Sequence, residues 1–470
     1  MPRLVLRAPK TFEKAFEGIR AELDVPSHFP DDVLAEANLA HPAATERLDA
    51  RHHRFVAVDP PGATDLDQAF MAERLGDGYR VLYAIADVGA FLTPGGLTDL
   101  EARKRGATLY SPDTRTPLHP PVISEDRASL LAGTEKPALL WTIDLAADGT
   151  AENWRLERAT VKVDEAITYT EAQQRIDEGT DERMTLLSEI GKLRQAKEAE
   201  RGGVSLNLPA QEVVEQDQSY GLEFDTSLPV EGWNAQISLL TGIVAGRTMM
   251  DAKVGLLRTL PPPFEKDLNR LRNTAKFLKL DWPDEVNYPD FVRALTPNEA
   301  RCNAFLLQAA RTFRGAGYVG FDGSTPKYPE HGAIASVYSH VTAPIRRLVD
   351  RFGNEILLSL YADERPPAWA LEALDELPSL MGQAKQRESA LERAMVDMAE
   401  TLVLEHSVGE TFDAFVVSID EKRDRATIQI AEPAIVTRMP IGNFKLAEEV
   451  TLRLDGVEVA KRRLKFKPVS

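Results

Sequence analysis

The sequence predicts an α+β protein with several domains. These are a small N-terminal helical module, a central domain with a mixed sheet plus helices, and a C-terminal OB-fold β-barrel. Three observations predict this class. The 470 residues exceed one ordinary domain, and 43% of them are hydrophobic, enough for a sizeable core. The centre of the chain changes from strand-like runs to helical ones, and the C-terminal part alternates over short strands.

Residues 1–50 form the predicted helical module. In "TFEKAFEGIRAEL", Phe12, Phe16, Ile19 and Leu23 recur at helical spacing. The segment "PDDVLAEANLA" has acidic residues directly after its proline, which is typical of a helix start. Two such helices fit a packing module or a helix-turn-helix unit, and the sequence leaves both open.

The central domain is predicted over 51–405. Its first part contains β-rich runs separated by Gly, Pro and Asp turns: "RFVAVD", "YRVLYAIADV", "ALLWTIDLAADG" and "WRLERATVKVD". The polar segment "YTEAQQRIDEGTDERMTLLSEIGKLRQAKEAE" predicts one long helix, and helices dominate from 232 to 406. Strands followed by helices favour a mixed sheet with its helices grouped after it.

The third domain is predicted over 407–470. Its short alternating strands and charged turns suit a five-stranded OB barrel, a frequent platform for single-stranded nucleic acid. A β-sandwich fragment or a protein-interaction barrel is the alternative. The terminal "KRRLKFK" interleaves cations with Leu464 and Phe466, which suits either a nucleic-acid surface or a solvated strand face.

The composition favours a cytoplasmic protein with no membrane partner. The only cysteine is Cys302, so no intrachain disulfide can form. The N-terminus lacks the apolar core of a signal peptide, and no run approaches the roughly 18 to 20 apolar residues of a membrane span. The net charge of −17 speaks against a broad basic footprint for nucleic acid. However, 407–470 holds eleven Lys and Arg against ten Asp and Glu, so charge alone does not identify the partner.

Three aspartates cluster in "FVAVDPPGATDLDQAF": Asp59, Asp65 and Asp67. Asp59 ends a predicted strand, and Asp65 and Asp67 project to the same side if the backbone between them is extended. Like charges this close need open water or a cation between them. Hard oxygen ligands favour Mg²⁺ or Mn²⁺, which usually keep water and substrate phosphate as further ligands. A loop of solvated acids is the alternative.

Two arginines stand at the start of another predicted helix, in "TAPIRRLVDRFGNEILLSLYA". Pro344 suits the first helical position, which places Arg346 and Arg347 in the first turn. The helix dipole disfavours cations there, so the pair indicates a site for a bound anion such as a phosphate. The alternative is an ion pair with Asp350, one turn away, which fits Arg347 better than Arg346.

Together these stretches resemble the ribonuclease II family, whose catalytic unit is called the RNB domain. The resemblance extends from about Arg51 to Leu404. It rests on several motifs in one order: "AVDPPGATDLDQA", "YAIADVGAFLTPGGLTDLEARKRGATLY", "TPLHPPVIS", "AITYTEA" and "HGAIASVYSHVTAPIRRLVD". The segment after 406 is similar to the S1-type OB domain at the C-terminus of that family.

The resemblance implies processive 3′-to-5′ hydrolysis of single-stranded RNA to nucleoside 5′-monophosphates, with Mg²⁺, or Mn²⁺ in its place, as the cofactor. The expected partner is therefore a single-stranded RNA 3′ end, bound by a monomer. By position, Asp59, Asp65 and Asp67 would hold the metal, and Asp65, Asp67 and Arg346 would carry catalysis. Arg346 would hold the scissile phosphate as its charge develops.

The resemblance also implies three substrate-binding residues. Tyr110, in "GATLYSPD", matches a tyrosine that contacts the last nucleotides of the RNA. Glu392, in "ALERAMVDMAETLVL", matches an acid near the 3′-terminal nucleotide, and Arg347 stands beside the catalytic arginine. A packed core tyrosine and a solvated helix glutamate are the alternatives for Tyr110 and Glu392.

Several positions depart from the family pattern. Gln68 stands where the family has a fourth aspartate; its amide oxygen is a weak metal ligand, so we expect weaker metal binding. Ala84 replaces a frequent histidine, and Gln236 and Gly242 replace an acid and asparagine pattern. The alternative to an active nuclease is therefore a weakened or inactive RNA-binding member of the family.

About 50 helical residues precede the match, in place of the two cold-shock barrels of many relatives. We expect a weaker grip on short RNA and a wider entrance, which leaves structured RNA open as a substrate.

Overall fold

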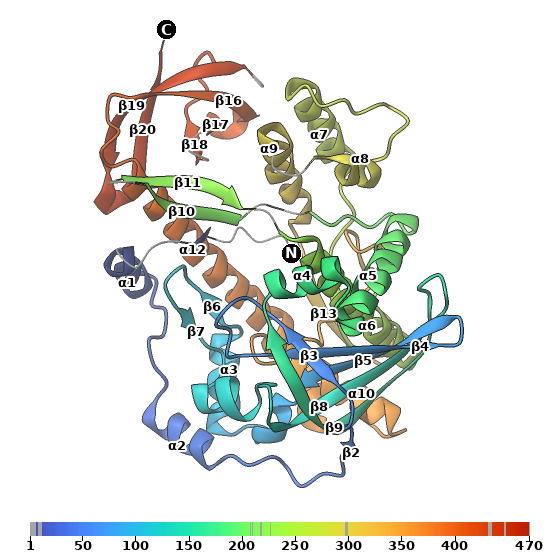
Figure 1. Cartoon of the computed structure of the whole chain (residues 1–470). Helices are drawn as coiled ribbons and strands as arrows, with labels where there is room; N and C mark the ends of the chain where they lie inside the picture. The colour runs from blue at the N-terminus through green and yellow to red at the C-terminus, as the bar shows by residue number, and fades with distance from the viewer. Residues whose placement is uncertain are drawn as a thin grey trace.

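The structure is a computed structural model that describes residues 6–7, 12–206, 208, 210–216, 219–225, 227–296, 299–430, 435–445 and 448–469. In Figure 1 the main sheet lies at one end of the molecule and the C-terminal strands at the other, with α12 (Leu377–Val403) running between them. None of the helices among the described residues has both the length and the apolar character to cross a bilayer.

The main sheet has six strands in the order β2-β9-β3-β4-β5-β8. Their bounds are β2 Leu48–Asp49, β3 Phe55–Val58, β4 Gln68–Leu75, β5 Gly78–Ala86, β8 Glu135–Leu145 and β9 Ala151–Ile167. The long strand β9 pairs with β8 along its first part and with β3 at its end, so five of the strands close into a ring. The four β-rich runs predicted from the sequence are therefore all strands of this sheet.

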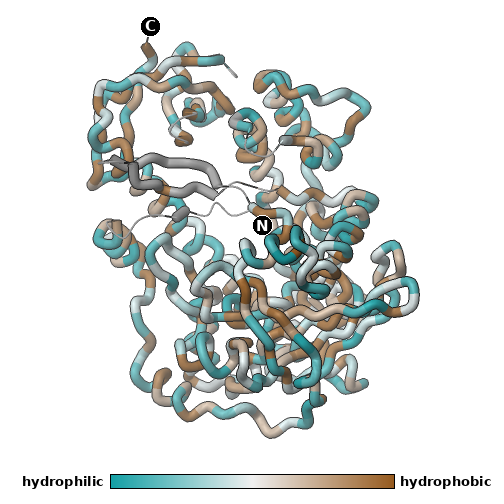
Figure 2. Tube along the Cα trace, in the orientation of Figure 1, coloured by the Kyte–Doolittle hydropathy of each residue, from teal (hydrophilic) through white to brown (hydrophobic). Residues whose placement is uncertain are grey.

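Both faces of the sheet are buried, which explains the continuous apolar run in β3. Val56 and Val58 pack in a core that includes side chains of α5 and α6, whereas Phe55 and Ala57 pack in a second core on the other face. Alternate residues of a strand point to opposite faces, so a strand covered on both sides carries no polar alternation. Figure 2 shows hydrophobic residues along these strands and more mixed colouring on the outer helices.

The predicted long polar helix is wrong, because the structure has two helices there. They are α4 (Tyr169–Glu178) and α5 (Glu182–Glu200). Gly179 ends α4 in the left-handed conformation with φ 64°, and the Asp181 side chain caps α5 by accepting the Arg183 N–H. A glycine at this position and an aspartate N-cap are ordinary stop and start signals, so "EGTDE" divides the helix.

The helix after "TAPIRR" begins later than predicted. It is α10 (Leu348–Tyr361), and Pro344 lies in the turn before it rather than at the first helical position. Arg347 has extended backbone, with φ −142° and ψ 120°, and bridges Ala107. Because this bridge holds the chain extended, both arginines precede the first helical turn, and the argument from the helix dipole does not apply to them.

The C-terminal segment forms a five-stranded antiparallel sheet in the order β18-β17-β16-β19-β20, as predicted for an S1-type OB domain. The bounds are β16 Thr411–Asp420, β17 Arg425–Ile430, β18 Ile435–Met439, β19 Glu449–Glu458 and β20 Arg463–Pro468. Its core includes Phe412, Val416, Ile428 and Leu452. The α+β fold class predicted from the sequence is confirmed.

The two N-terminal helices, α1 (Glu13–Glu22) and α2 (Asp31–Leu39), pack on different parts of the molecule. Phe16 and Ile19 of α1 join the core of the C-terminal sheet together with α12, whereas Ala37 of α2 belongs to a core of the main sheet. The predicted module is thus divided between two cores. The domain boundaries 1–50, 51–405 and 407–470 stay predictions.

The remaining helices and strands complete the frame. The helices are η2 Val88–Phe91, α3 Leu97–Arg105, η3 Val122–Arg127, α6 Pro229–Ala252, α7 Glu265–Phe277, α8 Tyr288–Ala294, α9 Ala300–Ala309, η4 Ala310–Phe313, α11 Ala368–Glu372, η5 Glu421–Arg423 and η6 Val459–Lys461. The strands are β1 Leu6–Arg7, β6 Leu109–Tyr110, β7 Arg115–Thr116, β10 Ala210–Gln216, β11 Ser219–Asp225, β12 Val254–Thr259, β13 Gly317–Asp322, β14 Glu330–His331 and β15 Ser336–Val337.

Candidate active site

A cavity of about 530 Å³ lies between the β3–β4 loop, the β6–β7 hairpin, the turn before α10 and one side of α12. Seven of the eight residues that the sequence singled out line it: Asp59, Asp65, Asp67, Gln68, Tyr110, Arg346 and Glu392. The eighth, Arg347, lines an adjoining cavity instead. The fold therefore brings together residues from four separate segments of the chain.

The sheet fixes the positions of the aspartates. Asp59 directly follows β3, and its N–H donates to the carbonyl of Ile167 at the end of β9 (3.1 Å). Asp67 directly precedes β4, and its carbonyl accepts the N–H of Ala86 (2.9 Å). Leu66 lies between Asp65 and Asp67 and is buried in the core. Asp65 and Asp67 therefore both face the cavity, as the two-residue spacing predicted.

Asp67 and Arg346 form the central contact of the cavity. The Nε of Arg346 lies 3.2 Å from Oδ2 of Asp67, and Oδ1 of Asp67 accepts the backbone N–H of Ile345 at 2.8 Å. The Asp67 side chain is 6% exposed and that of Arg346 is 50% exposed. The guanidinium is thus held on one side by a buried carboxylate and faces the cavity on the other.

Burial dominates the titration of the carboxylates. Burial raises the pKa of Asp67 to about 8, although the charge of Arg346 and the Ile345 N–H oppose this shift. Burial, with a smaller contribution from the charge of Asp65, likewise raises the pKa of Asp59 to about 6 against the charge of Arg346. Removing water from a carboxylate disfavours its ionised form, and a bound cation restores it.

Asp65 is held by protein groups. Its Oδ1 accepts from Nη1 of Arg115 at 2.6 Å, and its Oδ2 lies 3.4 Å from the hydroxyl of Tyr110. Arg115 also pairs with Glu125 (3.1 Å) and donates to the hydroxyl of Thr64. The β6–β7 hairpin therefore lies over Asp65, and a cation bound at Oδ1 would compete with the Arg115 guanidinium.

Gln68 is engaged at both ends of its amide. Its Nε2 donates to the carbonyl of Thr342 (2.6 Å), and its Oε1 accepts from the hydroxyls of Tyr83 (2.5 Å) and Ser238 (3.4 Å). An ionised aspartate or glutamate could not donate to the Thr342 carbonyl. The role of Gln68 as a weak metal ligand stays a prediction, since the oxygen would first have to leave its protein donors.

The donor chemistry of the cavity suits a hard cation, but three donors are not gathered around one point. Asp59, Asp65 and Asp67 supply carboxylate oxygens, the type that Mg²⁺ and Mn²⁺ prefer. Within the described ranges, however, no group of three or more His, Cys, Asp or Glu side chains is placed to hold a metal ion. A metal would therefore need a shift of Asp65 away from Arg115, or additional ligands from water and substrate.

Arg347 is paired as the structural alternative expected. Its Nη2 donates to Oδ1 of Asp350 at 2.6 Å, and its Nε contacts the other carboxylate oxygen. Oδ1 of Asp350 also accepts the Ala343 N–H (2.7 Å), so the pair fixes the turn that carries Arg346. A substrate-binding role for Arg347 stays a prediction.

The cavity is also lined by side chains that the sequence did not single out, among them Arg115, Tyr169, Asn234 and Met395. Tyr169 and Asn234 interact with each other, with 3.5 Å between the Asn234 Nδ2 and the Tyr169 hydroxyl. They come from the starts of α4 and α6, which no local pattern links. Arg115 follows Tyr110 by five positions, and its proximity to the aspartates depends on the hairpin.

Two departures from the family pattern have packing reasons. A Cβ on Gly242 would lie 2.1 Å from Cε2 of Tyr338, so only glycine fits there. Gln236 is buried and donates from Nε2 to Glu198. Both positions lie on the part of α6 that packs inside the protein.

Comparison with known proteins places the chain in a family. Residues 47–363 match the RNB domain, and residues 410–469 match the RNase II-type exonuclease C-terminal S1 domain. The chain therefore belongs to the RNB-domain, or ribonuclease II, family, and the resemblance seen in its motifs is confirmed.

Named relatives come from both eukaryotes and bacteria. The exosome complex exonuclease RRP44 homolog A of Arabidopsis thaliana is 30% identical over 328 residues, which cover 66% of this chain and 35% of that protein. Ribonuclease R of Aquifex aeolicus is 24% identical over 514 residues, which cover 98% of this chain and 71% of the relative. The chain spans 34% to 45% of the length of the RRP44 and dis3 relatives.

Solved structures share the fold. Mycoplasma genitalium RNase R in complex with ribose methylated single-stranded RNA superposes with a TM-score of 0.85 at 18% identity, over 97% of this chain and 78% of that one. Yeast Ssd1, a pseudonuclease, superposes with a TM-score of 0.71 at 15% identity, over 94% and 57% of the two chains. The fold is thus shared by a ribonuclease and by a protein described as a pseudonuclease, so function must be argued from the site.

Proposed function

We propose that this chain is a 3′-to-5′ exoribonuclease that hydrolyses RNA to nucleoside 5′-monophosphates with a divalent metal, Mg²⁺ or Mn²⁺. The observation that carries the proposal is the contact between Asp67 and Arg346 in the cavity that Asp59 and Asp65 also line. The RNase R and RRP44 relatives support the same class of reaction.

Arg346 is the proposed phosphate-binding group. Its Nε is taken by Asp67, and in the described part of the chain no protein hydrogen bond to its two terminal nitrogens is found. These nitrogens can donate to two oxygens of one phosphate. Because Asp67 fixes the guanidinium before substrate arrives, little reorganisation is needed as negative charge builds on the phosphate.

Asp59, Asp65 and Asp67 are the proposed metal-binding carboxylates, with Gln68 as a weak further donor. When bound, a divalent metal supplies positive charge to the phosphate and makes a bound water more acidic. The raised pKa values of Asp59 and Asp67 indicate two carboxylates that gain most from such a cation. Arg115 would release Asp65 as the site fills.

Tyr110 and Glu392 are the proposed contacts for the 3′-terminal nucleotides. Both line the cavity, from the β6–β7 hairpin and from α12 respectively. A tyrosine ring offers a stacking surface to a base, and a carboxylate can accept from a ribose hydroxyl, which distinguishes RNA from DNA. The proposed substrate is single-stranded RNA acted on by a cytoplasmic monomer, with structured RNA as the alternative, since one similar RNase R structure holds double-stranded RNA.

The second candidate function is RNA binding without hydrolysis. It is favoured by the pairing of Asp65 with Arg115 and by the engaged amide of Gln68, which together leave no three-carboxylate group in the described residues. The similarity to the pseudonuclease Ssd1 supports the same alternative.

A labelled RNA separates the two candidates. Poly(A) of about 30 nucleotides, labelled at its 5′ end, is incubated with the protein and Mg²⁺ or Mn²⁺ and resolved on a sequencing gel. The proposal expects a ladder that collapses to a short end product, and no ladder with Asp67→Asn or Arg346→Gln. An intact strand with either metal, combined with a retained gel shift, would establish the binding protein instead.

A further inference from the structure

A second charged region lies against a neighbouring face of α12, at the junction with the C-terminal sheet. Two cavities of about 520 Å³ and 270 Å³ adjoin there and share four arginines: Arg311, Arg314, Arg393 and Arg438. We call the two together the arginine cavity. Its walls come from α7, α9 and η4, from α12, and from β16, η5, β17, β18 and β20 of the C-terminal domain.

The charge of the arginine cavity is opposite to that of the chain. Nine arginines and no lysine line it, against three carboxylates, whereas the whole chain has a net charge of −17. Arginine presents a planar fork of N–H donors that matches two oxygens of a phosphate, and lysine does not. A cationic lining made of arginine alone therefore favours an anion with phosphate-like geometry over general electrostatic attraction.

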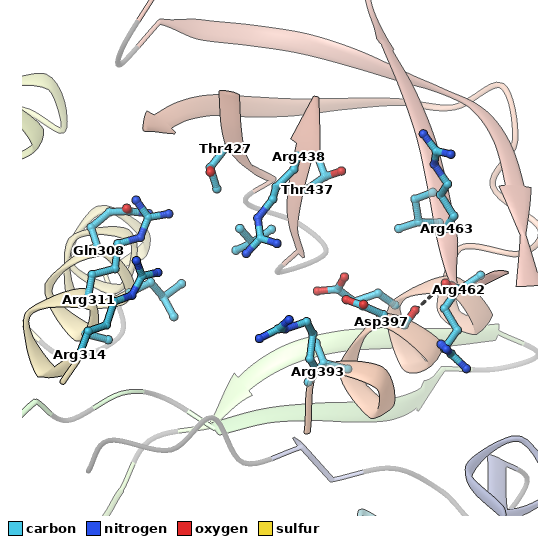
Figure 3. Close-up of a pocket in the computed structure, with 17 residues that line it drawn as sticks. Gln308, Arg311, Arg314, Arg393, Asp397, Thr427, Thr437, Arg438, Arg462 and Arg463 are labelled. Carbon is cyan, nitrogen blue, oxygen red and sulfur yellow. Dashed lines mark hydrogen bonds between the residues drawn. The ribbon is translucent and has the colours of Figure 1, made fainter. Parts of the chain in front are cut away.

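The four shared arginines converge on one space, and the nearby charge of Asp397 acts on Arg393 and Arg438 without a direct ion pair. Figure 3 shows Arg311 and Arg314 on one side, Arg438 entering from the C-terminal sheet and Arg393 from α12, with their side chains directed toward one space. Arg311 donates to the hydroxyl of Ser418 at 3.3 Å. Among the residues that the structure describes, none of the four forms an ion pair within 4.0 Å.

The convergence of the arginines disfavours the positive charge of Arg311. Burial, together with the charges of Arg270, Arg314 and Arg438, lowers the pKa of Arg311 to about 10, although the charge of Asp420 opposes this shift. The Arg311 guanidinium is thus partly desolvated among other cations, and a bound anion would offset both effects.

Two elements, α12 and η4, place the arginine cavity beside the candidate active site. Glu392 and Met395 of α12 line the active-site cavity, whereas Arg393 and Val396 on the adjoining face line the arginine cavity. The two cavities therefore lie on adjoining faces of α12.

The second element that relates the two sites is η4. Phe313, two residues beyond Arg311, lines a cavity that shares Tyr169, Asn234 and Arg346 with the active site. We expect a single strand that leaves the active-site cavity to pass this adjoining cavity and to approach the arginines.

We propose that the arginine cavity binds backbone phosphates of the RNA segment that lies 5′ to the nucleotides held in the active-site cavity. The identity of the anion as RNA rests on the function proposed above. This cavity gives the chain a grip that depends on substrate length, because a strand of a few nucleotides fills the active site without reaching it.

Binding measurements test the proposal without requiring hydrolysis. Fluorescence anisotropy gives the Kd of a tetranucleotide and of a strand of about 25 nucleotides, in an Asp67→Asn background and over a range of salt. The test variant is Arg311→Gln with Arg438→Gln. The matched control, Arg54→Gln with Arg365→Gln, removes the same charge at two exposed positions outside the cavities. Thermal unfolding checks that each variant folds.

The proposal expects the test variant to weaken binding of the long strand on the order of tenfold, and to reduce the salt slope by about 0.7 for each phosphate that is no longer neutralised. Tetranucleotide binding and the control variant should change less than about twofold. Arg311→Lys with Arg438→Lys should give an intermediate loss, because charge remains but the fork is gone.

Unchanged long-strand binding in the folded test variant would overturn the proposal. An acidic protein segment would then be the alternative ligand of the arginine cavity. An equal loss in the control would also overturn it, since the effect would then be general charge. If the gel assay shows no hydrolysis but the length-dependent loss persists, the arginine cavity stands and only the exoribonuclease proposal fails.

Discussion

Asp67→Asn should stabilise the metal-free protein at neutral pH while it removes activity. Burial raises the pKa of Asp67 to about 8 from a usual value of 3.8, so burying this carboxyl group at pH 7 lowers the free energy of unfolding. With ~1.4 kcal/mol for each pKa unit between 3.8 and pH 7, this cost amounts to about 4 kcal/mol. Asparagine carries no charge and still accepts the Ile345 N–H, and the attraction of Arg346 for the ionised carboxylate is already included in this pKa. The expected gain is therefore about 4 kcal/mol.

The sign of this effect depends on pH. Between about pH 4 and pH 8 the folded protein holds a proton on Asp67 that the unfolded chain has released, so wild-type stability falls as pH rises through this window. The advantage of the asparagine variant should therefore vanish below pH 4 and be largest above pH 8. Thermal unfolding in EDTA at several pH values measures it, and saturating Mg²⁺ should stabilise the wild type more than the variant.

A second aspartate serves as the control. Although burial raises the pKa of Asp181, its hydrogen bonds and charge interaction with Arg183 prevail and lower it to about 2. Asp181→Asn should therefore lower the Tm at pH 7, the opposite of Asp67→Asn. A lower Tm for Asp67→Asn in EDTA at pH 7 would refute the reasoning, because the buried carboxylate would then be stabilising as it stands.

Three further predictions concern Arg115, Gly242 and His119. Arg115→Gln frees the Asp65 carboxylate, so metal affinity should rise by about threefold to tenfold, measured from Mg²⁺-induced Tm shifts or Mn²⁺ resonance; an unchanged affinity would show that Arg115 does not compete with the metal. Gly242→Ala places a Cβ 2.1 Å from the ring of Tyr338 and should lower stability by about 1 to 3 kcal/mol in denaturant unfolding, whereas Gly382→Ala, with open space around it, should not. Burial and the nearby charge of Arg351 lower the pKa of His119 to about 3, so the unfolded chain binds its proton first and His119 reduces stability as pH falls from about 6.5 to 3. His119→Gln should remove part of that slope, and identical slopes would contradict the assignment.

The local chemistry of the candidate site could be predicted from the sequence. Asp59, Asp65 and Asp67 follow an apolar run that is typical of a buried strand, and the two-residue spacing places the last two on one side. Arg346 was identified by an argument that fails in detail, because α10 begins at Leu348 and not at Pro344. The arginine is nevertheless beside Asp67, since the turn before α10 packs against the start of β4.

Features that depend on distant segments could not be predicted. The ion pair between Arg115 and Asp65 exists because the β6–β7 hairpin folds over the β3–β4 loop. The arginine cavity assembles η4, α12 and the C-terminal sheet, and each segment alone carries arginines that no local pattern singles out. The division of the predicted long helix, in contrast, could have been predicted from the sequence. Gly179 and Asp181 are ordinary signals for the end of one helix and the start of the next.

The most direct test of the central claim follows both ends of one RNA. The same strand is labelled at its 3′ end or its 5′ end and incubated with the protein and Mg²⁺. The account predicts that the 3′ label appears at once as a nucleoside 5′-monophosphate while the 5′-labelled strand shortens stepwise, and that Asp67→Asn abolishes both without loss of binding. Release of the 5′ label first, or bound RNA that stays intact with Mg²⁺ and with Mn²⁺, would contradict it.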